Sequence, residues 1–134
     1  MIANVPVTQL DFQGALVLFF AFSIGHAIAD FPLQGEFLSR GKNRHIPPPP
    51  LADGGSSPRR LWIYLMSAHT LTHAGMVWII CGSPLLAFAE FVIHWAIDAM
   101  KCERVTGFES DQWLHLLTKA AYVAVIWGGL VAVG

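Results

Sequence analysis

The chain has 134 residues, of which 54% are hydrophobic and only 13% carry a charge. Soluble domains usually contain about 25% charged residues, so this balance is typical of a membrane protein. The formal net charge of -1 lacks the basic excess with which nucleic-acid-binding proteins attract phosphates. We therefore expect no nucleic acid partner, and the length suits one domain spanning residues 1–134.

Four apolar segments are long enough to cross a bilayer, which requires about 17 to 25 residues in a helix. They cover residues 14–33, 61–81, 84–100 and 112–133. Only Gly82 and Ser83 separate the second segment from the third, so these two are expected to form a tight antiparallel hairpin. The sequence therefore predicts an all-α fold, a bundle of four transmembrane helices in a single membrane domain.

The segment 34–60, between the first two predicted spans, is rich in proline and glycine. It contains the runs PPPP at 47–50 and GGSSP at 54–58. Proline lacks a backbone donor, and such compositions do not form regular elements. This stretch is therefore predicted to be a long flexible loop.

The distribution of basic residues predicts how the helices are oriented. Seven of the eight lysines and arginines lie at 34–60 or 101–111, and the two ends of the chain and the 82–83 turn have none. Basic residues concentrate in cytoplasmic loops, so both long loops are expected in the cytoplasm, with the N- and C-termini outside. We therefore predict a multi-pass protein of the bacterial inner (cytoplasmic) membrane that contacts membrane lipid. A homo-oligomer stays open as its assembly state.

Ionisable residues recur at a spacing of four inside or beside these apolar segments. Residues at i and i+4 lie on the same face of a helix, so each predicted helix carries a single polar stripe. The stripe residues are His26, Asp30, His69, His73, Glu90, His94, Asp98, Asp111 and His115. A charged group in a span costs about 2.5 to 3.5 kcal/mol and usually faces the bundle interior. We therefore expect the four stripes to meet in one polar chamber, in the cytoplasmic half of the bilayer.

Eight of these side chains predict a divalent-metal site. Imidazole and carboxylate groups bind zinc, iron and manganese, and helical bundles build such sites from inward-facing side chains on several helices. The predicted ligands are His26, Asp30, His69, His73, His94, Asp98, Asp111 and His115. They are too many for one four-coordinate ion, so either two metals bind or some carboxylates orient a histidine through its second ring nitrogen. No cysteine joins the set, so the metal stays open among Zn, Fe and Mn.

Glu90 is the deepest acid and the candidate catalytic base. It could take a proton from a metal-bound water molecule, whose pKa the ion lowers towards about 7. The sequence thus favours a metal-dependent hydrolase acting on a lipid-like or cytoplasm-accessible substrate. Two other functions stay open. One is a transporter or relay for a metal ion or proton; the other is a structural or assembly subunit whose His-carboxylate network only holds the helices together.

Two lysines are weaker signals near the same stripes. Lys101 and Lys119 could each bind an anionic headgroup or a phosphate. Alternatively, Lys101 extends its ammonium group to the membrane surface. Lys119 could instead form a local ion pair with His115 or Asp111.

The spacing of these residues resembles a bacterial membrane family catalogued as domain of unknown function 3307. That family has H-x-x-x-D-F-x-L-Q, a lysine, H-x-x-x-H, H-x-x-x-D-x-x-K and F-x-x-D-Q-x-x-H in this order. The corresponding residues are His26, Asp30, Phe31, Leu33, Gln34, Lys42, His69, His73, His94, Asp98, Lys101, Phe108, Asp111, Gln112 and His115. The pattern covers 26–115 and leaves out the insert at 46–58. The resemblance implies a helical membrane fold and the pooled polar set, and it implies no activity.

Overall fold

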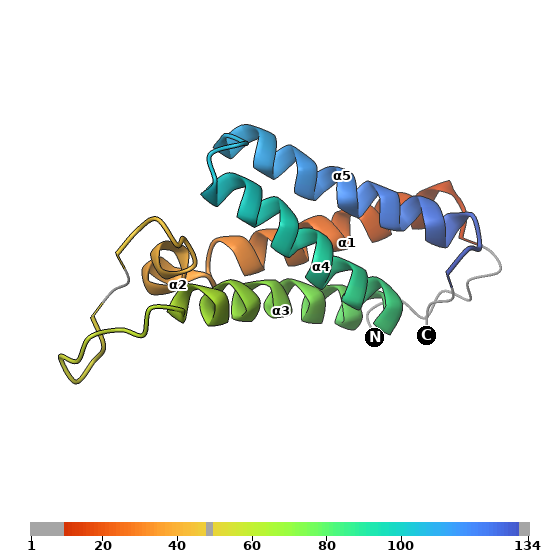
Figure 1. The fold of residues 1–134 in the computed structure, drawn as a ribbon. Helices are drawn as coiled ribbons and strands as arrows, with labels where there is room; N and C mark the ends of the chain where they lie inside the picture. Colours follow the sequence, from red (N-terminus) through yellow and green to blue (C-terminus); the bar gives the residue numbers. More distant parts are fainter. Residues whose placement is uncertain (1–9, 48–49, 132–134) are drawn as a thin grey trace.

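The computed structural model describes residues 10–47 and 50–131, and every regular element in these two ranges is a helix. The helices are α1 (Phe12–Asp30), α2 (Gly35–Gly41), α3 (Leu61–Cys81), α4 (Pro84–Cys102) and α5 (Phe108–Trp127). The four long helices run alongside one another, and the short α2 lies at one end of them (Figure 1). Helix α3 packs against α1 and α4, and α5 packs against the same two helices. The long helices therefore enclose a common interior.

The prediction of a four-span transmembrane bundle is wrong. In the described part of the chain, only α1 combines sufficient length with a mean hydropathy, 1.7, that suits a membrane span. A single such helix near the N-terminus is weak evidence, because core helices and signal sequences share these properties. Helices α3, α4 and α5 have the length, but their histidines, acids and lysines lower their hydropathy. A multi-pass location in the inner membrane, with both termini outside, is therefore not established.

The segment between α1 and α3 is not irregular throughout, as the sequence led us to expect. Residues Gly35–Gly41 form α2, which packs against α3. Glu36 lies in its first turn and Arg40 in its last, where each charge suits the helix dipole, and the two side chains pair at 3.3 Å. Residues 48–49 of the proline run lie outside the described residues, as do residues 132–133 of the fourth predicted segment.

The predicted two-residue hairpin between α3 and α4 is confirmed. Gly82 ends α3 with a φ of 70°, a left-handed conformation that glycine adopts without steric cost, and its N–H donates to the Trp78 carbonyl at 2.7 Å. The Ser83 hydroxyl then accepts from the N–H of Leu86 at 3.4 Å, and Pro84 occupies the first turn of α4. The chain thus reverses at once, which places α4 directly beside α3.

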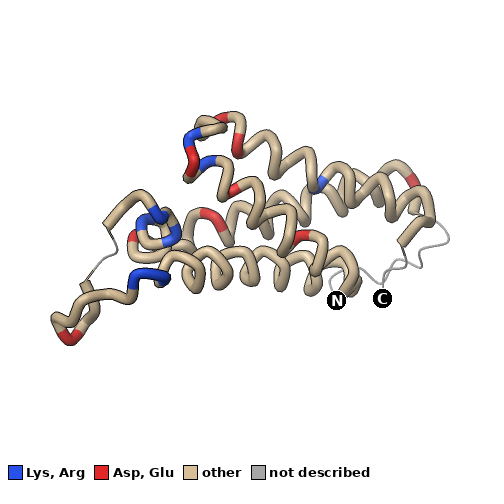
Figure 2. The backbone as a smooth tube through the Cα atoms, in the orientation of Figure 1, with Lys and Arg blue, Asp and Glu red and all other residues tan. Residues whose placement is uncertain are grey.

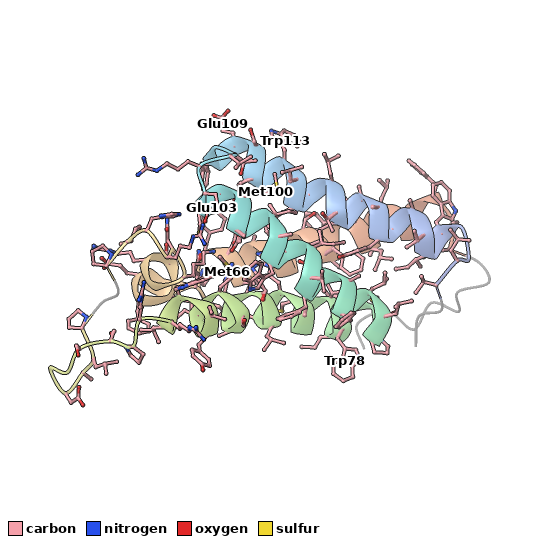
Figure 3. All side chains as sticks on the ribbon, in the orientation of Figure 1. Met66, Trp78, Met100, Glu103, Glu109 and Trp113 are labelled. Carbon is pink, nitrogen blue, oxygen red and sulfur yellow. The ribbon has the colours of Figure 1, made fainter. Side chains whose placement is uncertain are left out.

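The interior of the bundle has an apolar half and a polar half. The apolar half lies away from α2 and comprises Ala15, Leu18, Phe22, Val77, Ile80, Cys81, Leu86, Tyr122, Val123 and Ile126. The half nearer α2 holds buried histidines, acids and lysines. Many large apolar side chains lie instead on the outside, such as Phe20 (67% exposed) and Trp78 (58% exposed; Figure 3). Polar groups therefore fill the half of the interior nearer α2.

Candidate metal centre

All nine stripe residues predicted from the sequence are buried, each at most 9% exposed. They come from the C-terminal half of α1, the middle of α3, the N-terminal half of α5 and both halves of α4, where Glu90 lies before the midpoint and His94 and Asp98 after it. On each helix the stripe residues are spaced four apart, so they all lie on one face of that helix. The stripes meet inside the bundle, at the end nearer α2.

Five imidazole rings from the four long helices form the middle of this cluster. His94 lies between two neighbours, with its ring centroid 3.7 Å from that of His73 and 4.0 Å from that of His115. His69 lies 4.6 Å from His73, and His26 lies 4.9 Å from His115. Five rings this close would repel one another if most of them were protonated. The packing therefore requires imidazoles that are mainly neutral, the form that binds metals.

Three overlapping groups of side chains place possible ligand atoms within 4.8 Å of one another. The groups are Asp30, His69, His73 and His94; His26, His94 and His115; and Asp98, Asp111 and His115. Together they contain all eight ligands predicted from the sequence, and Glu90 belongs to none of them. These buried histidines and aspartates could hold a metal ion.

Many nitrogen atoms of these rings have no hydrogen-bond partner among the described residues. Both ring nitrogens of His26, His69 and His73 are unsatisfied, as is Nε2 of His94 and His115. His69 Nε2 and His73 Nε2 each lie 3.3 Å from Asp30 Oδ1, but without the geometry of a hydrogen bond. Buried polar groups nearly always have partners, and each exception requires an explanation. A cation would satisfy the nitrogen of each neutral ring that carries a lone pair, whereas the other nitrogen carries a hydrogen and needs an acceptor.

The four buried acids each accept a hydrogen bond from a cation or an amide. Gln112 Nε2 donates to Asp30 Oδ2 at 2.9 Å. The lysine pairs are Lys42–Asp98 at 2.5 Å, Lys119–Glu90 at 2.5 Å and Lys101–Asp111 at 2.6 Å. Lys119 thus pairs with Glu90, not with the two partners considered from the sequence, and Lys101 binds an acid of the cluster.

These contacts keep the acids ionised and leave the cluster with a net negative charge. Burial alone would raise the pKa of each acid, but neighbouring histidines, lysines and Gln112 hold all four pKa values below their ordinary range. Four carboxylates against three lysines leave one negative charge when the imidazoles are neutral. A bound cation, or a proton on one imidazole, would balance this charge.

The histidines differ in how readily they take that proton. Burial lowers the pKa of His73 and lowers that of His94 well below its ordinary value. Burial also opposes a proton on His115, but Asp111 and Asp98 outweigh it and raise the pKa of that ring. His115 Nε2 lies 3.4 Å from Asp98 Oδ1 and 3.6 Å from Asp111 Oδ1. His115 therefore binds a proton more readily than His73 or His94.

Glu90 contacts Nδ1 of His94, the ring in the middle of the cluster. Its Oε1 lies 3.1 Å from Nδ1 of His94 and also accepts from Lys119, whereas its Oε2 is buried with no hydrogen-bond partner among the described residues. A proton on His94 Nδ1 would point at Glu90 and leave Nε2 free as a ligand, as in many metal sites. Glu90 thus contacts one candidate ligand, and its role as a base remains a prediction.

No family model matches this chain, and no curated protein or solved structure matches it either. The resemblance to the family of unknown function therefore stays a prediction. The function must be consistent with the chemistry of the cluster itself.

Proposed function

We propose that this protein binds a divalent metal ion at the centre of its helical bundle and uses it to hydrolyse a substrate. One observation carries the proposal: buried imidazoles from four helices converge with ring nitrogens that have no hydrogen-bond partner in the described structure. Nitrogen and oxygen donors without cysteine suit zinc, iron or manganese.

The unsatisfied nitrogens favour a metal site over a purely structural network. A network that only holds helices together would be expected to satisfy its buried donors and acceptors, because each unmade hydrogen bond costs about 1 to 3 kcal/mol. The lysines satisfy one oxygen of each acid that they contact, yet His26 has no hydrogen-bond partner at either ring nitrogen. Most of the buried side-chain atoms without a hydrogen-bond partner in the described structure are thus imidazole nitrogens of the cluster.

The hydrolytic part of the proposal rests on Glu90. A bound divalent ion would supply Lewis acidity and lower the pKa of a nearby water molecule. Glu90 Oε1 is fixed by Lys119 and His94, and Oε2 is the oxygen left to accept a proton from that water. Asp98 and Asp111, which have their own lysines, would serve as ligands or would orient His115.

Elemental analysis of the purified protein tests the metal site. We expect stoichiometric Zn, Fe or Mn in the wild type and loss of most of it in His94→Ala and in His69→Ala. His45→Ala is the matched control, because His45 is exposed and contacts Glu103 away from the cluster. Folded wild-type protein that takes up no stoichiometric metal, even after incubation with each ion, would sink the proposal.

A further inference from the structure

A pocket with a volume of about 280 Å³ lies at the α2 end of the bundle, next to the polar cluster. Its walls come from α3, α4 and the segment that follows α2. The lining residues are Lys42, Arg44, Trp62, Met66, Trp95, Ala99, Cys102 and Glu103. Met66 and Glu103, which Figure 3 labels, lie at this end of the molecule. The volume suits a small molecule rather than a polymer.

Lys42 connects this pocket to the candidate metal centre. Its side chain lines the pocket, is 8% exposed, and donates through Nζ to Asp98 Oδ2 at 2.5 Å. The same oxygen of Asp98 lies 3.3 Å from His69 Nε2, and the other oxygen lies 3.4 Å from His115 Nε2. A single carboxylate therefore separates the Lys42 ammonium group from the imidazoles. An ammonium group has three donors, so Lys42 can bind a second acceptor while it remains paired with Asp98.

The walls of the pocket are apolar and aromatic. Trp62 of α3 and Trp95 of α4 contact each other, with ring centroids 6.3 Å apart, and Met66 adds a buried thioether. Indole rings offer a large flat surface to an apolar or planar group. Arg44 and Glu103 also line the pocket and pair at 2.7 Å, so they neutralise each other. Lys42 is thus the pocket's polar contact nearest to the metal centre.

Basic and acidic residues both gather at this end of the bundle (Figure 2). Figure 2 shows most of the basic residues around α2, at the start of α3 and at the turn between α4 and α5. In the pocket, Arg44 pairs with Glu103 and Lys42 with Asp98, so a phosphate there competes with these two acids for the basic residues that line it. The opposite end of the bundle is almost free of basic residues (Figure 2).

We infer that this pocket binds a small phosphate ester that carries an aromatic or other apolar group. The phosphate lies against Lys42, beside the candidate metal centre, and the apolar group lies against the wall that Trp62 and Trp95 form together. The identity of this ester as the substrate rests on the proposed hydrolysis, whereas its binding does not. A metal near Asp98 competes with Lys42 for the carboxylate and leaves the ammonium group freer to bind the phosphate.

Calorimetric titration with phenyl phosphate, phenol and inorganic phosphate tests this inference on the full chain. Each titration is done with metal-free protein and with protein loaded with zinc and freed of excess ion. We expect phenyl phosphate to bind about tenfold or more tightly than either fragment, because only it has both the charge and the ring. Zinc should increase its affinity further. Equal affinities for phenol and phenyl phosphate would overturn the inference.

Two variants separate the contributions of the charge and the aromatic wall. Lys42→Met should weaken phenyl phosphate binding about tenfold, whereas Arg40→Met, which removes an equal charge from the exposed side of α2, should not. Trp62→Leu leaves the Lys42–Asp98 pair intact and should weaken phenyl phosphate binding without changing that of inorganic phosphate. Trp113→Leu is its control, because Trp113 is 67% exposed on α5.

The outcomes distinguish this inference from the proposed function. If Lys42→Met fails to fold, Trp62→Leu decides the result, and unchanged affinity in that variant overturns the inference. If the protein binds no zinc, the metal-free titrations still test the pocket. Phenyl phosphate binding that depends on Lys42 and Trp62 in metal-free protein would then support the pocket while the hydrolase proposal fails.

Discussion

Lys119 is 2% exposed, and its ammonium group lies 2.5 Å from a Glu90 oxygen in the centre of the bundle. Removing one partner of such a buried pair leaves the other charge without compensation, which costs about 3 to 5 kcal/mol. We expect Lys119→Met to lower the free energy of unfolding by this amount in urea titrations. The double variant Lys119→Met/Glu90→Gln should recover much of the loss. A single variant as stable as the wild type would show that the pair contributes nothing.

Glu90→Gln tests the base. The amide keeps the size of the side chain and can still accept from His94 Nδ1, but it cannot take a proton from water. It also leaves Lys119 without its counter-charge, so rates are compared on folded protein. We expect metal content to stay unchanged and hydrolysis of phenyl phosphate by the metal-loaded protein to fall about 100-fold or more, the usual contribution of a general base. Glu36→Gln is the control, because Glu36 pairs with Arg40 on the surface of α2. An unchanged rate in Glu90→Gln would remove Glu90 from the reaction.

The residues at the centre of the cluster could be predicted, but their partners could not. The spacing of four is local, so the sequence alone places His69 and His73, or Asp111 and His115, on one helix face. Lys42 binds an acid 56 residues away, and Gln112 binds one 82 residues away. No local pattern encodes such contacts, because they depend on how the helices pack. Only the family resemblance pointed to these two residues.

At the level of elements, the turn between α3 and α4 fixes how the polar residues of α3 are aligned with those of α4. Gly82 has a φ of 70°, where a residue with a Cβ is strained by roughly 1 to 2 kcal/mol. We expect Gly82→Ala to destabilise the protein by about that much in urea titrations. Gly75→Ala, in the middle of α3 with nothing within 4 Å of the added Cβ, should be neutral or stabilise by up to about 1 kcal/mol. Equal effects of the two substitutions would contradict this.

The observed helix boundaries show which features of the sequence predict where a helix begins. The start of α4 at Pro84 was predicted, because serine, proline and a preceding glycine fix it. Helix α5 begins at Phe108, four residues before the predicted span, because its first turn carries Glu109 and Asp111 and is therefore not apolar. Helix α2 was missed because it has seven residues and lies in a segment that was judged by its prolines and glycines.

At the scale of the whole molecule, the apolar composition led to the wrong prediction of four membrane spans, whereas the spacing of the polar residues predicted the buried cluster. The apolar content was counted as membrane-spanning length, yet three of the four long helices carry enough polar groups to fall short of a membrane span. Those same polar groups are the ones that meet in the bundle centre. The feature that predicted the site therefore argues against the predicted spans.

Metal binding should stabilise the whole fold, because the candidate ligands come from four helices and are brought together only when the chain is folded. A ligand present at 100 times its Kd and bound only to the folded state stabilises it by about 2.7 kcal/mol. For a chain of this length, we expect zinc, iron(II) or manganese to raise the Tm by roughly 5 to 10 °C. Calcium, which requires six to eight oxygen ligands, should leave the Tm unchanged. A chelator should reverse the increase, His45→Ala should retain it, and the double variant His69→Ala/His94→Ala should abolish it. A Tm that responds equally to calcium, or equally in the double variant, would mean that the ions act elsewhere on the chain.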